Sequence, residues 1–143
     1  MLNLNPIRER NAVSEIIYSI KETRFKSKFR DAYGTMEGFE ITTDKQVIRM
    51  GISEGRQCCE HTGFFMSEDN LDEFIGAALL LVETVSDCLV PDKLSDFYEG
   101  GTMFVNFKTN RGVLQFTAYN SHNGYYSHSA VIESEQLETN EYL

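Results

Sequence analysis

The chain has 143 residues, of which 41% are hydrophobic and 24% are charged, and its formal net charge is −9. A chain of this length buries roughly two thirds of the surface that its unfolded form exposes, so it needs neither disulfides nor a structural metal to hold a core. The longest apolar run, Ala77–Val82, is far shorter than the ~20 residues of a membrane-spanning helix. The acidic balance disfavours nonspecific binding to DNA, because phosphates are contacted mainly by Lys and Arg. We therefore expect one soluble domain, residues 1–143, that binds no membrane.

Cysteine usage and the first residues bear on the compartment. The three cysteines are an odd number and two of them are adjacent, a pattern that fits a reducing compartment better than a disulfide framework. The first residues lack the apolar stretch and the small-residue cleavage site of a secretory signal. Both observations predict a cytoplasmic protein.

Charge divides the chain into two parts. Residues 1–30 hold seven basic and three acidic residues (+4), whereas residues 31–143 hold six basic and nineteen acidic residues (−13). The pattern predicts a basic helical arm at 1–30, an acidic sheet body at 31–134 and an acidic, frayed tail at 135–143.

The arm is predicted to be a helix. Asn5 is suited to capping it and Pro6 suits its first position, and apolar residues then recur at helical spacing at Val13, Ile16, Ile17 and Ile20. Such a helix either docks on the body with a solvated basic end or serves as a contact for a partner or for a homodimer.

The body changes to a period of two from Phe39 onward, which predicts strands. We expect a short helix at Leu71–Ile75, stopped by Gly76, and a buried strand at Ala77–Val85, with a longer helix through Leu81 as the alternative. The other predicted strands are Phe39–Thr43, Gln46–Ser53, Arg56–Phe65, Thr102–Thr109, Val113–Asn120 and Tyr125–Glu133. The fold class that follows is α+β, a mostly antiparallel sheet with an N-terminal helix and one short internal helix.

Polar residues that are able to do chemistry gather in two segments, Arg56–His61 and Asn120–His128. We call these the first and second polar segments; together they hold every histidine and two of the three cysteines. The candidate binding residues are Arg56, Cys58, Cys59, Glu60, His61, Asn120, His122, Asn123, Tyr125, Tyr126 and His128. Tyrosine faces beside amide and imidazole groups have the composition of a nucleotide or protein contact site. A tight hairpin turn between tyrosine-rich strands explains the second segment equally well.

Two further interpretations of these segments, a structural zinc site and a thiol enzyme, are less well supported. A zinc site would need Cys59, His61, His122 and His128, because adjacent Cys58 and Cys59 point to opposite faces of a strand and no CxxC knuckle is present. A thiol enzyme would pair a cysteine with a histidine, but a cysteine on a half-buried strand is more often a small hydrophobe. No complete catalytic motif occurs, so no catalytic residue and no cofactor are predicted.

Residues 60–99 carry ten acidic residues against Lys93 alone. The candidate acidic interaction face comprises Glu68, Asp69, Asp72, Glu73, Asp87, Asp92, Asp96 and Glu99. Such a face can engage a basic groove that normally holds nucleic acid, although a merely solubilising surface has the same composition.

At these segments the sequence resembles a family of small, mostly phage and prophage proteins grouped as domain of unknown function 7448. The matching residues are Gln57–Glu60, Leu71–Gly76 and Ser121–Ser127, within a resemblance that covers roughly residues 39–132. His61 and His122 depart from the family pattern. The resemblance implies an α+β domain with an antiparallel sheet and no established activity.

The phage-like setting, together with the acidic body, leads to a functional expectation. We expect a non-enzymatic counter-defence protein in the host bacterial cytoplasm, an acidic anti-CRISPR-like inhibitor that binds a host nuclease or effector in competition with nucleic acid. One alternative sequesters a nucleotide signal with Arg56, Asn123, Tyr125 and Tyr126 as contacts. Further alternatives are a small metal- or thiol-dependent hydrolase and a structural subunit.

Overall fold

The computed structural model describes residues 12–32, 34–55, 61–94, 100–121 and 127–143. In these residues the chain forms strands joined by turns, with two short 3-10 helices, η1 and η2, as the helical elements. The strands are β1 (Ala12–Lys26), β2 (Thr35–Thr43), β3 (Val47–Ser53), β4 (His61–Met66), β5 (Ala78–Val85), β6 (Gly101–Thr109), β7 (Gly112–Ser121), β8 (Ser129–Glu133) and β9 (Glu138–Tyr142), and the 3-10 helices are η1 (Leu71–Phe74) and η2 (Pro91–Leu94).

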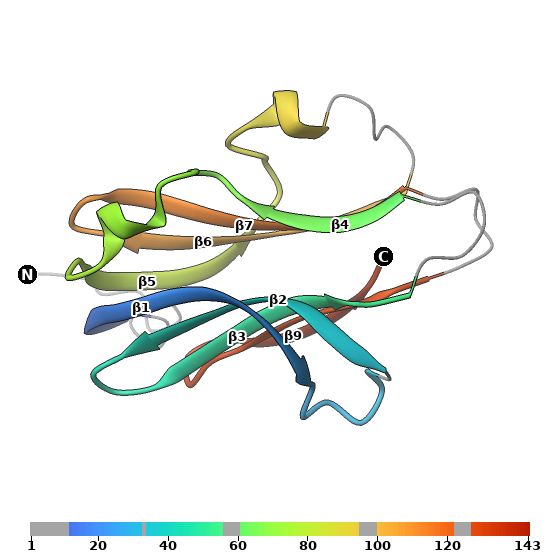
Figure 1. Ribbon diagram of the computed structural model, residues 1–143, viewed down its shortest axis with the longest axis horizontal. Coiled ribbons are helices and arrows are strands. Elements are labelled where there is room, and N and C mark those ends of the chain that lie inside the picture. Colours follow the sequence, from blue (N-terminus) through green and yellow to red (C-terminus); the bar gives the residue numbers. More distant parts are fainter. Residues whose placement is uncertain (1–11, 33, 56–60, 95–99, 122–126) are drawn as a thin grey trace, which may run out of the picture.

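All described strands belong to one antiparallel sheet in the order β4-β7-β6-β5-β1-β2-β3-β8-β9. The sheet folds over on itself. Strands β4, β7, β6 and β5 form an upper layer, and β1, β2, β3, β8 and β9 form a lower one (Figure 1). Strand β1 joins the two layers, because its first residues pair with β5 and its later residues pair with β2.

The predicted α+β class with an N-terminal helix is wrong, because Ala12–Lys26 is a strand in the middle of the sheet. A register shift between Ile17 and Ser19 explains the misleading pattern. The extra residue of such a bulge lets Ile17 and Ile20, which are three positions apart, both face the core. Ile17 is fully buried, whereas its neighbour Ile16 is 38% exposed, as alternation along a strand requires. A bulged strand can therefore imitate helical spacing.

The described parts of the other predicted strands overlap strands of the structure, although Ser127 and His128 of the predicted strand Tyr125–Glu133 precede β8. The hairpins β2–β3 and β6–β7 form at the expected places, and Gly112 has a φ of +115°, the left-handed region that favours glycine. Residues 78–85 form the strand β5 rather than a longer helix. The internal helix is one 3-10 turn, η1, in which Asn70 accepts a hydrogen bond from the N–H of Asp72.

The tail does not fray, because Glu138–Tyr142 forms β9 along the whole of β8. Main-chain pairing is indifferent to the charge of outward side chains, and Lys28 neutralises Glu138 in an ion pair. Leu143 follows and is only 7% exposed. The acidic residues of this segment therefore indicate an edge strand with a solvent-facing side and not an unstructured tail.

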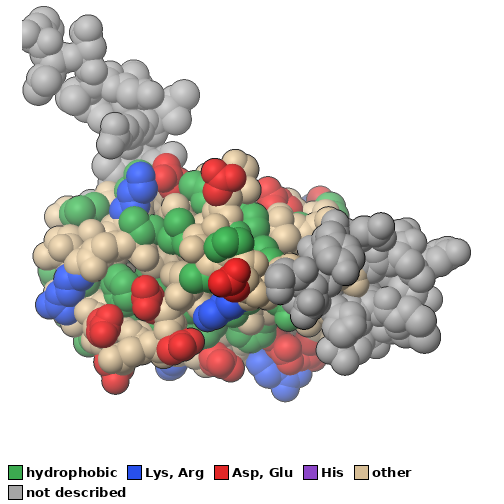
Figure 2. All heavy atoms as spheres, turned by 90° about the horizontal axis from the view of Figure 1, so that it is seen from above, with side chains coloured by type: hydrophobic (Ala, Val, Ile, Leu, Met, Phe, Trp, Pro, Cys, Tyr) green, Lys and Arg blue, Asp and Glu red, His purple; other side chains and the backbone are tan. Residues whose placement is uncertain are grey.

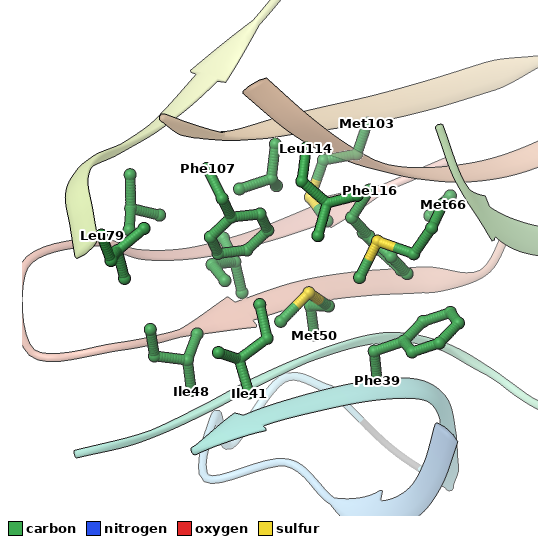
Figure 3. Close-up of a cluster of buried hydrophobic side chains, with 14 of the residues drawn as sticks. Phe39, Ile41, Ile48, Met50, Met66, Leu79, Met103, Phe107, Leu114 and Phe116 are labelled. Carbon is green, nitrogen blue, oxygen red and sulfur yellow. The ribbon is translucent and has the colours of Figure 1, made fainter. Parts of the chain in front are cut away.

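The core lies between the two layers (Figure 3). Phe39, Ile41, Ile48 and Met50 reach it from β2 and β3, and face the upper-layer side chains Met103, Phe107, Leu114 and Phe116. The ring of Phe39 meets the ring of Phe64 edge to face, with their centroids 5.7 Å apart. Within the described residues, no helix has the length and apolar character needed to cross a membrane.

Candidate functional site

The two polar segments leave the sheet at neighbouring places. His61 at the start of β4 is paired with Ser121 at the end of β7, and Ser53 at the end of β3 contacts His128 just before β8. The tertiary structure therefore joins the two segments at both of their described ends. The remaining predicted binding residues lie outside the described residues, namely Arg56, Cys58, Cys59, Glu60, His122, Asn123, Tyr125 and Tyr126.

His128 is a buried side chain held by main chain. It is 6% exposed, and its Nδ1 lies 2.9 Å from the carbonyl oxygen of Ser53 and 3.1 Å from the Oγ of the same residue. Because a carbonyl oxygen can only accept a hydrogen bond, Nδ1 carries the proton in this pair. This nitrogen therefore has a structural partner, which ties β8 to β3.

Asn120 is 1% exposed, and its Nδ2 donates to the main-chain oxygen of Leu143 at 2.9 Å. The main chain of His128 also pairs with Leu143 in both directions, at 3.0 Å and 2.8 Å. Leu143 packs on Gly101, where an added Cβ would lie 2.8 Å from the Leu143 Cα. Asn120 and His128, the two described binding candidates of the second polar segment, thus both contact Leu143.

The structure gives no support for a metal centre in the part of the chain that it describes. No group of three or more His, Cys, Asp and Glu side chains there is arranged to hold a metal ion. Of the predicted zinc ligands Cys59, His61, His122 and His128, only the side chain of His128 is described. The described cysteine, Cys88, is half-buried.

Two acidic segments, 68–73 and 87–92, meet where Lys93, which follows the second segment, pairs with Asp69 of the first. We call Glu68, Asp69, Asp72, Glu73, Asp87 and Asp92 the acidic surface; all six side chains belong to exposed residues. Asp96 and Glu99 lie outside the described residues. Figure 1 shows η2, the yellow coil, above the upper layer, and Figure 2 shows red carboxylates spread among apolar and neutral side chains on that side.

Lys93 and Gln115 bring these segments together. The Nζ of Lys93 donates to the carbonyl oxygen of Met66 at 3.1 Å, lies 3.5 Å from the carboxylate of Asp69 and sits 5.4 Å from the ring centre of Phe65. The fully buried Gln115 amide donates to the carbonyl oxygen of Asp87 at 2.9 Å. The sequence does not predict a role for either residue, although Lys93 is the one cation of residues 60–99 and could have been singled out on that ground.

Two cations moderate the acidic surface. Lys93 pairs with Asp69, and Arg111 donates to the carbonyl oxygens of Glu73 and Ile75 at 3.1 Å and 2.7 Å. Six carboxylates against these two cations leave a formal charge of −4. The acidic surface therefore carries a net negative charge, but part of that charge is balanced by Lys93 and Arg111.

An ion pair lies near the first polar segment. The guanidinium of Arg24 hydrogen-bonds both carboxylate oxygens of Glu54, each at 2.6 Å. The hydrogen bond from Arg24 lowers the pKa of Glu54 from 4.5, and Glu54 in turn raises the pKa of Arg24. Arg24 is exposed and Glu54 is partly exposed, so salt weakens their attraction.

A family model described as a domain of unknown function (DUF7448) matches residues 10–132 of the chain. The match confirms the resemblance that the motifs at 57–60, 71–76 and 121–127 indicated, and it extends further toward the N-terminus, over β1. No curated protein and no solved structure matches the chain.

Proposed function

The chain belongs to the DUF7448 family, and on that premise we propose that it is a non-enzymatic binding protein whose acidic surface occupies a basic, nucleic-acid-binding groove of a partner protein. The observation that supports the proposal is the joining of two acidic segments, 68–73 and 87–92, through Lys93 and Gln115. A solubilising surface needs no such joining, whereas a binding surface needs carboxylates at fixed spacing.

The specific form of the proposal is a phage-type counter-defence inhibitor that acts in the bacterial cytoplasm on a host nuclease, in the manner of an anti-CRISPR protein. The acidic surface would compete with guide or target nucleic acid for cationic side chains of the nuclease. Opposite charges accelerate encounter and become less effective as salt rises. The N-terminal helix that was expected to mediate a homodimer is replaced by β1, so a homodimer has lost that support.

The test is binding to a panel of CRISPR effectors, each with and without guide RNA, at two salt concentrations. We expect micromolar or tighter binding that weakens with salt and is lost when guide RNA is already bound. Complete absence of binding across the panel contradicts the anti-CRISPR form, and binding that is unaffected by salt contradicts the electrostatic mode.

A matched pair of variants assigns the surface. The double variant Asp72→Lys with Asp87→Lys reverses two exposed carboxylates of the acidic surface, and Asp31→Lys with Glu135→Lys makes the same change in net charge at exposed positions elsewhere. We expect the first pair to weaken binding by about tenfold or more and the second by less than about threefold. Equal losses in both would assign the effect to net charge alone.

A further inference from the structure

A hollow of about 350 Å³ is lined by residues of β1, β2 and β4 and by the segment 68–71. Its lining includes the apolar side chains of Ile20, Phe39, Phe64 and Leu71, and we call it the seam groove. The buried Phe39 ring and the half-buried Phe64 ring give it an aromatic floor. The groove is large enough for one or two apolar side chains, but it is open to solvent and differs from the enclosed pocket of a small-molecule enzyme.

One wall of the groove is a free strand edge. In the described residues β4 pairs only with β7, so its other side has no strand neighbour. The N–H of Ser67 donates to Gln115, and antiparallel pairs alternate, so Thr62, Phe64 and Met66 turn their main-chain groups away from β7. The carbonyl oxygen of Met66 indeed accepts from Lys93 on that side. Thr62 and Phe64 therefore present N–H and C=O groups along the open edge.

The charged side chains at the rim of the groove that have no ion-pair partner among the described residues are acidic. Lys21 lies 3.5 Å from the carboxylate of Glu40, and Lys93 lies 3.5 Å from that of Asp69. Glu22 and Glu68 also line the groove, both are exposed, and neither forms an ion pair with a residue that the structure describes. A bound chain that carries Lys or Arg beside an apolar residue would complement this rim.

We propose that the seam groove binds an extended, basic segment of a partner protein, which adds to the free edge of β4 and places an apolar side chain over Phe39 and Phe64. Main-chain hydrogen bonds to Thr62 and Phe64 would give affinity, and the alternate side chains would give specificity. This inference rests on the proposed function, because the same class of basic partner is engaged, but it names a second binding surface, which shares Glu68 and Asp69 with the acidic surface, and a mode of binding.

The direct test uses a seven-residue probe peptide with lysine at positions 1, 3, 5 and 7, valine at positions 2 and 6, and phenylalanine at position 4. Hydrogen exchange of the protein amides is measured with and without the peptide. We expect the Thr62 and Phe64 amides to exchange at least about tenfold more slowly with the peptide, while the Ser67 amide, which already donates to Gln115, changes little. A peptide with glutamate in place of lysine should not protect them. Binding without protection of these two amides would overturn the proposal.

Two sets of variants separate the edge from the charge. Thr62→Pro removes an edge N–H without removing a bond to β7, and Thr62→Val keeps that N–H. We expect the proline variant to lose peptide binding and the valine variant to keep it. Because the proline variant could fail to fold, Glu22→Lys provides a second test, with Asp31→Lys as the control. Unchanged peptide binding in the glutamate variant would overturn the proposal.

The same experiments distinguish this inference from the proposed function. If Asp72→Lys with Asp87→Lys abolishes effector binding while Thr62→Pro and the glutamate variant leave peptide and effector binding intact, the seam groove is not a binding site and the acidic surface stands. If the peptide protects Thr62 and Phe64 but no effector binds, the groove stands and the anti-CRISPR form fails. Protection that rises with protein concentration in the absence of peptide would overturn the inference in favour of a second copy of this chain at the β4 edge.

Discussion

The Nδ1 of His128 lies 2.9 Å from the carbonyl oxygen of Ser53, and this hydrogen bond joins the residue before β8 to the last residue of β3. The contact joins the last residue of the second polar segment, 120–128, to the strand that precedes the first, 56–61. Because a carbonyl oxygen only accepts, the Nδ1 of His128 is the donor in this hydrogen bond. The His128 ring therefore ties the start of β8 to the end of β3, and this has consequences for stability.

Replacing His128 with alanine should destabilise the protein by about 1–3 kcal/mol, because a buried ring and its hydrogen bond are both removed. The measurement is urea unfolding followed by circular dichroism. Ser127→Ala, at the exposed neighbouring position, is the control and should change stability by less than about 0.5 kcal/mol. A His128→Ala variant as stable as the parent would show that the contact contributes nothing to the fold.

Leu143 should contribute to stability although it follows an acidic edge strand. Leu143→Ala removes side-chain packing against Gly101 and should cost about 2–3 kcal/mol in the same assay. Leu143→Met conserves the volume and should cost less than about 1.5 kcal/mol. Equal stability of the alanine and methionine variants would mean that only the main-chain bonds of Leu143 to His128 and Asn120 matter.

The strand assignment of residues 12–26 can be tested with two adjacent isoleucines. Ile17→Ala should cost about 2–5 kcal/mol, because Ile17 is fully buried. Ile16→Ala should cost less than about 1 kcal/mol, because Ile16 is on the outer face and 38% exposed. A helix with one buried apolar face would make both substitutions costly, so comparable losses in urea unfolding would contradict the strand.

The Arg24–Glu54 pair predicts a pH dependence. Folding lowers the pKa of Glu54 from 4.5, so the pair stabilises the native state above that value and the contribution is lost as pH falls through the lower folded pKa. In Arg24→Gln the midpoint of Glu54, followed by NMR, should rise toward 4.5. Lys28→Gln, whose partner is Glu138, should leave that midpoint where it is. An unmoved midpoint in Arg24→Gln would assign the lowered pKa to another cause.

Local patterns predicted the hairpins well, because turn residues and alternation act over a few positions. Asn110, Arg111 and Gly112 produce the β6–β7 turn, and the hairpin around Asp44 and Lys45 forms as expected. The same reasoning failed for β1, since apolar spacing in a bulged strand and in a helix coincide over a short stretch. It failed for β9, because the pairing of an edge strand depends on its neighbour rather than on its own composition.

The candidate site divides in the same way. Residue types pointed to polar segments and to carboxylates, and six of the eight predicted acidic residues are described and exposed. They did not indicate that Asn120 and His128 hold Leu143, or that Lys93 connects two acidic segments. Those contacts join residues far apart in the chain, and no local pattern encodes a long-range contact.

By itself, the sequence determined that the chain is acidic, that its body is a sheet with turns at definite places, and that it resembles the family to which it belongs. Composition, turn chemistry and motif order are properties of neighbouring residues. Only the tertiary structure decided that β1 joins two layers, that two acidic segments form one surface and that the free edge of β4 borders an apolar groove. These depend on which strands pair, and pairing is settled by the burial of side chains from the whole chain against one another.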